Sequence, residues 1–188
     1  QISRYVHNKI MQIRREMQQY EVMYNTLHSY LKYEIKTKTQ KKPKITIKKI
    51  PDMLIAAIRF HGQYKEEPIY FAKLVKVAGQ YFLGGSLSMC YGKKKEGCFD
   101  IEMAVFVSQP INTKQVRSRI LKGGKAVTLQ YKGPYEDIAK AYDMLSIYCK
   151  THHLKLQSPP REFPIKGMWN IIPRPSKQYI TEIQFMVA

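Results

Sequence analysis

The sequence predicts an α+β domain, with two helices on one side of an antiparallel sheet, preceded by a long coiled-coil helix. Three observations predict this fold class. An apolar heptad pattern runs through residues 3–36 without Gly or Pro, and a charged break follows at 37–43. In residues 44–188 the same order of predicted strands and helix then occurs twice. With 188 residues and 44% apolar content, the chain is long enough for one packed domain and an appendage.

The first segment, residues 1–36, is predicted to be a dimerisation helix. Its apolar residues follow one another in alternating steps of four and three, which keeps them on one stripe of a left-handed helix pair. A narrow stripe on so long a helix favours a partner helix in a homodimer. A single helix packed along its own domain remains the alternative. The stripe consists of Val6, Ile10, Ile13, Met17, Tyr20, Tyr24, Leu27 and Leu31.

Residues 37–43 are predicted to be a basic linker that ends at Pro43. They belong to a lysine-rich stretch, residues 32–49. This stretch is either a solvated linker or an arm that contacts phosphates. The net charge of +18, from 32 basic and 14 acidic residues, favours a polyanion nearby. No apolar run approaches the roughly 20 residues that span a bilayer, and no signal peptide opens the chain. We therefore expect a cytoplasmic protein without membrane contact. Because the chain begins at Gln1, we also expect a fragment whose missing part precedes it.

Two similar strand-and-turn segments open the two halves of residues 44–188. When Gly62 is set on Gly133, Tyr64 falls on Tyr135. A helix is predicted after each turn, over residues 68–78 and 135–153. Pro68 and Gly79 suit the first turn and the C-terminal cap of the first helix. The second helix has acidic residues in its first turn and one apolar face.

Each half is predicted to close with a strand, over residues 99–107 and 179–187. These two segments align without a gap, and Glu102 falls on Glu182. One further strand precedes each of them, near 81–91 and 161–168, although glycines interrupt the pattern over 81–98. Each half is therefore a strand–helix–strand–strand unit, and the two units are read as a duplication.

Several motifs in the second half resemble the GyrI-like or AraC effector-binding family. They are the Gly133-Pro134-Tyr135 turn that opens a helix, the helical run 138–145, the segment 158–163 and Thr181-Glu182-Ile183. The resemblance covers residues 44–188, and the first half carries it less clearly because Gly62-Gln63-Tyr64 lacks the proline. A long helix directly before such a domain is similar to the MerR-type multidrug-responsive transcription regulators.

The resemblance implies a ligand-sensing domain with a central cleft between its two halves. Family members bind lipophilic aromatic small molecules, mainly cations, between aromatic walls and a buried carboxylate. It also implies that binding is transmitted to DNA through a DNA-binding domain missing from this chain. The excess of basic residues leaves the sign of the ligand charge open. The candidate ligand-binding residues are Glu182, Glu102, Tyr135, Trp169, Tyr64 and Phe106.

Strand alternation gives a second interpretation of the two glutamates. It places Glu182 beside Gln184, on the face opposite the apolar residues that turn toward the helices. From the residues alone, Glu102 and Glu182 are solvated strand charges, and the resemblance is what favours a ligand role for Glu182. Trp169 is either a wall of the cleft or an ordinary core anchor.

No cofactor, metal or catalytic residue is predicted. Cys90, Cys98 and Cys149 have neither disulfide nor zinc spacing, and His152-His153 lacks a third ligand. Two alternatives remain open. One is a GyrI-like small-molecule hydrolase with Glu182 as the general base or proton donor and Tyr135 as a stabilising group. The other is a gyrase-binding or nucleic-acid-binding module.

Overall fold

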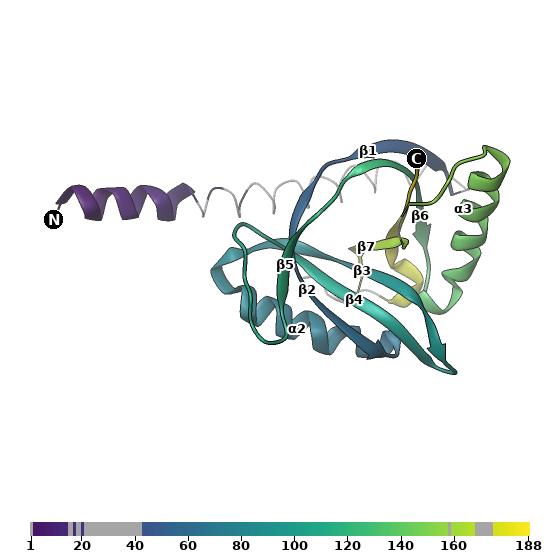
Figure 1. Ribbon diagram of the computed structural model, residues 1–188, viewed down its shortest axis with the longest axis horizontal. Coiled ribbons are helices and arrows are strands. Elements are labelled where there is room, and N and C mark those ends of the chain that lie inside the picture. The colour runs from purple at the N-terminus through teal and green to yellow at the C-terminus, as the bar shows by residue number, and fades with distance from the viewer. Residues whose placement is uncertain (1, 15–16, 18–19, 21–42, 158, 168–174) are drawn as a thin grey trace.

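The computed structural model describes residues 2–14, 17, 20, 43–157, 159–167 and 175–188 (Figure 1). From residue 43 onward the described chain has an α+β fold with one antiparallel sheet. No helix among the described residues has the length and apolar character that crossing a membrane requires. The strands and helices are β1 (Ile45–Ile50), β2 (Met53–Gly62), α2 (Glu67–Ala78), β3 (Phe82–Lys95), β4 (Cys98–Val107), β5 (Arg117–Leu121), β6 (Gly124–Lys132), α3 (Ala139–Thr151), β7 (Arg161–Lys166) and β8 (Ile180–Met186).

The eight strands lie in the order β1-β6-β8-β7-β3-β4-β2-β5. The predicted helices and closing strands are confirmed within a few residues, because α2, α3, β4 and β8 occupy those segments. The glycine-rich stretch does not break β3, which continues to Lys95 through register shifts. The sequence patterns missed β1 and β5. These are edge strands, and each lies in the part of the sheet formed by the other half of the chain.

The helices α2 and α3 cover the two sides of one face of the sheet. Helix α2 packs on β2 and β4 around Leu74, and α3 packs on β6 and β8 around Leu145. The central strands β7 and β3 lie between them. Their register pairs Glu162 with Ser88, so these two side chains point from the uncovered middle of the same face. This gap between the helix-covered regions positions the site described below.

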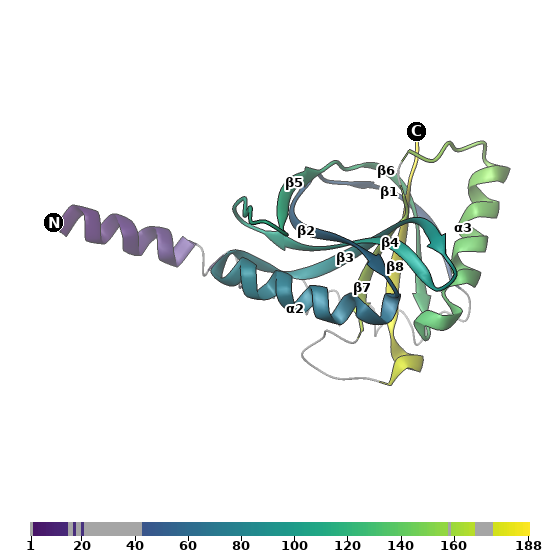
Figure 2. The ribbon, with the colours of Figure 1, turned by 60° about the horizontal axis from the view of Figure 1, so that its bottom comes forward.

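The opposite face of the sheet curls inward (Figure 2) and carries two further apolar clusters. At the edge of this face, the connection between β1 and β2 contacts the connection between β5 and β6. Asp52 accepts hydrogen bonds from the Gly123 amide and the Lys122 ammonium, both at 2.8 Å. A Cβ atom on Gly123 would lie 2.1 Å from the carbonyl oxygen of Ile50. Glycine is therefore required where these connections cross, and the crossing joins the two halves.

A helix is present at residues 2–14, 17 and 20, within the predicted coiled coil. Its apolar stripe is solvent-exposed, since Val6, Ile10 and Ile13 are 47%, 45% and 46% exposed. The remaining stripe positions, Tyr24, Leu27 and Leu31, lie outside the described residues. Pairing of this helix with a second copy stays a prediction.

The lysine-rich stretch is only partly described. Its last residues, 45–49, belong to strand β1 (Ile45–Ile50) and are neither linker nor free arm. Lys48 makes an ion pair with Glu182 at 2.7 Å. The phosphate-contacting interpretation therefore does not apply to Lys48, whose charge is already paired inside the domain.

Candidate functional site

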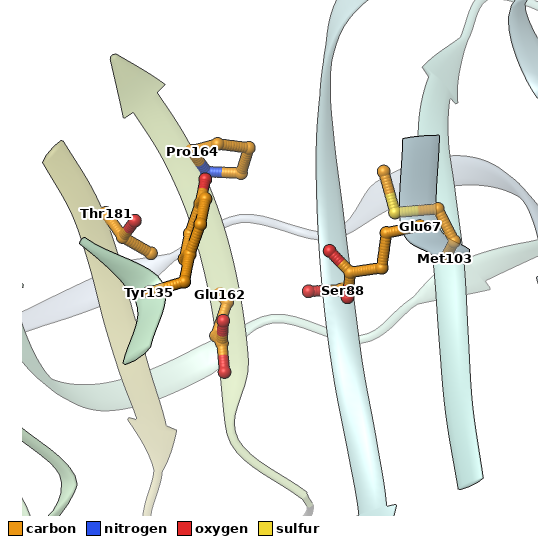
Figure 3. Close-up of a pocket in the computed structure, with 7 residues that line it drawn as sticks. All are labelled: Glu67, Ser88, Met103, Tyr135, Glu162, Pro164 and Thr181. Atoms are coloured by element: carbon orange, nitrogen blue, oxygen red, sulfur yellow. The ribbon is translucent and has the colours of Figure 1, made fainter. Parts of the chain in front are cut away.

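A small cleft lies between the helices, above the central strands β7 and β3. It encloses about 10 Å³, roughly the space of one water molecule. Figure 3 shows side chains from the two halves of the chain facing one another across it. The lining residues are Glu67, Ser88, Met103, Tyr135, Glu162, Pro164 and Thr181.

Glu162 forms the floor of the cleft on β7 and is 7% exposed. Its neighbours across the sheet are Ser88 on β3 and Ile183 on β8. The Tyr142 hydroxyl, on α3, donates a hydrogen bond to Glu162 Oε1. Burial raises the pKa of Glu162 because the charged form loses hydration, and the Tyr142 hydrogen bond offsets part of that rise.

Glu67 brings a second carboxyl group to the cleft from the first residue of α2. Local contacts determine where α2 begins. The backbone N–H of Gln63 donates a hydrogen bond to Glu66 Oε1 at 2.8 Å, and Pro68 lies in the first turn of the helix. Burial raises the pKa of Glu67 to about 8, with a further contribution from Glu162 and an opposing one from Ser88. Its Oε1 atom is buried without a hydrogen-bond partner.

Three tyrosines surround the two carboxyl groups. The Tyr135 ring, in the turn Tyr135–Asp137, contacts Tyr179 with centroids 5.5 Å apart. Tyr64 contacts Phe99 at 5.0 Å. Burial raises the pKa values of the Tyr64, Tyr135 and Tyr142 hydroxyls, so all three stay protonated and can donate hydrogen bonds. The site therefore combines aromatic walls with two acidic groups in a dry environment.

This arrangement favours neutral carboxyl groups when the cleft is closed. A buried carboxylate without a counter-charge is costly, and two of them in one cleft repel each other. The buried Oγ1 of Thr181 also lacks a hydrogen-bond partner. A cation or a hydrogen-bond donor entering the cleft would satisfy groups that the protein leaves unsatisfied. Among the described residues no cluster of His, Cys, Asp and Glu could hold a metal ion.

The structure places Glu182 and Glu102 on the sheet face opposite this cleft. Each is 8% exposed, so the interpretation as solvated strand charges is wrong. Lys48 and Gln184 bind Glu182, while Arg119 and the Tyr91 hydroxyl bind Glu102. The hydrolase alternative pairs Glu182 with Tyr135, and the two lie on opposite faces of the sheet.

The other predicted site residues do not all lie at the cleft. Tyr135 lines the cleft, and Tyr64 borders it through the electrostatic interactions of its hydroxyl with Glu162 and Glu67. Phe106 lies on the opposite face, where its ring stacks on Phe163 with centroids 6.1 Å apart. Trp169 lies outside the described residues.

Sequence reasoning missed the two cleft carboxyl groups. Glu162 lies inside the 158–163 segment that carries the family resemblance, so a signal was present there. Glu67 lies at the start of the first predicted helix, where an acidic side chain is favourable whether or not it belongs to a site. What identifies it is its place beside Glu162, and that depends on the pairing of β3 with β7.

Comparison with known proteins identifies the family. The model of the GyrI-like small molecule binding domain matches residues 43–188. The chain belongs to the GyrI-like family. The sequence-based resemblance to the GyrI-like effector-binding domains of MerR-type regulators is thereby confirmed. No curated protein sequence matches the chain.

Solved structures agree with the GyrI-like assignment. EcmrR, a MerR-family regulator, in its complex with DNA is 26% identical, with a TM-score of 0.70 over 99% of this chain and 70% of that chain. The EcmrR C-terminal domain is also 26% identical, with a TM-score of 0.69 over 78% of this chain and 98% of that one.

Two less similar solved structures share the fold. A hydrolase from Listeria innocua is 12% identical, with a TM-score of 0.53 over 84% of this chain and 98% of that one. SAV2435, solved with tetraphenylphosphonium, is 15% identical, with a TM-score of 0.51 over 77% of this chain and 94% of that one. At these identities the likeness concerns the fold alone. The family match and EcmrR support a ligand-sensing role in transcription regulation.

Proposed function

We propose that this chain is the ligand-sensing, dimerising part of a MerR-type transcription regulator that binds lipophilic aromatic cations. The ligand occupies the cleft between α2 and α3. Binding is transmitted to DNA through an N-terminal DNA-binding domain that is not in this sequence. The division into a dimerisation helix (1–36), a basic linker (37–43) and a duplicated, cytoplasmic effector domain (44–188) belongs to the same proposal.

The observation that carries the proposal is the pair of buried carboxyl groups between tyrosine rings. Tyrosine rings attract cations by about 0.5–2 kcal/mol for each good contact, and more when water is excluded. Glu162 and Glu67 supply the counter-charge once they lose their protons. A neutral ligand gains the apolar contacts but not this electrostatic contribution. The cleft thus selects for a positive charge on an aromatic frame.

The closed cleft must open to admit such a ligand, because drug-sized molecules occupy roughly 300 Å³ or more. Its walls come from α2 on one side and the turn before α3 on the other. Opening therefore moves the helix-covered halves of the sheet relative to each other. Strand β1, which the chain enters from the N-terminal segment, pairs with β6 under α3. This connection gives the movement a route toward the N-terminal helix.

Calorimetric titration with tetraphenylphosphonium tests the ligand class. This cation is the one present in the SAV2435 structure. We expect saturable binding with a Kd in the micromolar range, roughly −8 kcal/mol. Triphenylphosphine oxide, an aromatic compound without net charge, is expected to bind at least about tenfold more weakly. Equal affinities for the two compounds would contradict the proposed charge selection, and no binding of either would contradict the sensor role.

Sedimentation equilibrium tests the proposed dimer. Changing both Ile10 and Ile13 to Lys places two charges on the exposed apolar stripe and is expected to weaken dimerisation at least about 100-fold. Asn8→Lys is the matched control, since Asn8 is exposed on the far side of the same helix. A monomeric wild-type chain, or equal weakening by the control, would contradict dimerisation through this stripe.

A further inference from the structure

The inward-curling face of the sheet, opposite the ligand cleft, carries its own set of charged side chains. Its three carboxylates each have a cationic partner. Arg59 binds Asp100 at 2.7 Å, Arg119 binds Glu102 at 2.8 Å and Lys48 binds Glu182 at 2.7 Å. These pairs leave no acidic group on this face without a counter-charge among the described residues.

Arg161 is a buried cation on this face that has no carboxylate partner among the described residues. It lies on β7, between Met89 of β3 and Gln184 of β8, and is only 3% exposed. Its Nη2 atom donates to the Lys122 carbonyl at 2.7 Å, whereas Nε and Nη1 are buried without a partner. In the described part of the chain Arg161 makes no ion pair. A guanidinium group is thus buried with most of its donors unused.

A buried guanidinium group with unused donors is unfavourable unless an anion binds to it. Arginine does not lose its proton in proteins, so it cannot escape the cost of burial by becoming neutral. Burial lowers the pKa of Arg161, and the nearby Arg119 lowers it further, but the group remains charged at neutral pH. A buried ion without a counter-charge destabilises the folded protein. An incoming anion would remove most of that cost.

The unused donors have the geometry that oxyanions require. A guanidinium group has two edges, each with two parallel N–H bonds. The Lys122 carbonyl occupies one N–H of Nη2, which leaves the other edge complete. The Oε1 atom of Gln184, directly across the sheet, is also buried without a partner. An ion with acceptor oxygens and an O–H group satisfies both residues.

We propose that Arg161 and Gln184 form a binding site for a small oxyanion, and that hydrogen phosphate is the form that fits both side chains. Because Arg161 is only 3% exposed, the phosphate groups of a macromolecule cannot reach its guanidinium group. Glu162, the next residue of β7, points to the opposite face. The anion site is therefore separate from the cation cleft and does not depend on the function proposed for that cleft.

Thermal unfolding of the full chain with inorganic phosphate tests this site, with sodium chloride at equal ionic strength as the reference. At about ten times Kd, phosphate is expected to raise the Tm of the wild type by about 3 °C. Arg161→Met is expected to lose this response. Arg117→Met is the control, because Arg117 is an exposed arginine of β5 on the same face and should leave the response intact.

Calorimetry with phosphate gives the affinity directly and covers the case in which Arg161→Met does not fold. Arg161→Lys keeps the charge but loses the paired N–H edge, so we expect its phosphate affinity to fall at least about tenfold. The proposal is overturned if phosphate stabilises the wild type no more than chloride does. It is also overturned if Arg161→Met or Arg161→Lys binds phosphate as well as the wild type.

Discussion

Glu162→Gln is expected to lower the affinity for tetraphenylphosphonium about 100-fold, or roughly 3 kcal/mol. Glutamine keeps the shape of the side chain and can still accept the Tyr142 hydrogen bond, so the loss reports the missing negative charge. The variant is expected to be at least as stable as the wild type at pH 8. The reason is that burial raises the pKa of Glu162 in the folded state, which makes its ionisation a cost to folding. Calorimetric titration and thermal unfolding measure the two effects.

Glu182→Gln is the matched control for this experiment. Glu182 is the carboxylate that the family resemblance pointed to, and it lies on the other face of the sheet in an ion pair with Lys48. We expect this variant to bind the cation with wild-type affinity and to lose some stability because Lys48 loses its partner. If Glu182→Gln abolished binding while Glu162→Gln did not, the site would lie on the inward-curling face.

The helices and closing strands could be predicted because each is encoded locally. Helix α2 has Pro68 in its first turn and Gly79 at its end, and β8 alternates consistently along its length. Strands β1 and β5 could not be placed in the same way. Each is an edge strand whose position depends on a partner from the other half of the chain, and no short-range pattern encodes that pairing.

The candidate site also combines a residue that a local motif identifies with residues whose position depends on strand pairing. Tyr135 was identified because its turn carries a specific motif, and the structure places it in the cleft. Glu162 follows Arg161 in β7, and strand alternation separates their side chains by the thickness of the sheet. Which of the two faces the helices is decided by the register between β7 and β8. A bulge or a one-residue shift would exchange their roles, so the sequence alone could not assign the carboxyl group.

Cation binding is expected to strengthen as pH rises, because the ligand competes with protons for the cleft carboxyl groups. The pKa of Glu67 is raised to about 8 by burial and by Glu162, so below pH 8 a bound cation must displace a proton. Affinity for tetraphenylphosphonium should increase up to about tenfold per pH unit between pH 6 and 8 and then level off. Titration in two buffers of different ionisation enthalpy should show release of about one proton at pH 7.

The same raised pKa predicts the opposite trend for the stability of the ligand-free chain. Glu67 titrates near 4.5 when unfolded and near 8 when folded, so the folded state binds the proton more tightly. The resulting stability is fully present below pH 4.5 and is lost as pH rises to about 8. Glu67→Gln removes the titrating group and should flatten both this decline and the pH dependence of cation affinity. A wild-type affinity that stays constant from pH 6 to 9 would show that Glu67 does not exchange its proton for the ligand.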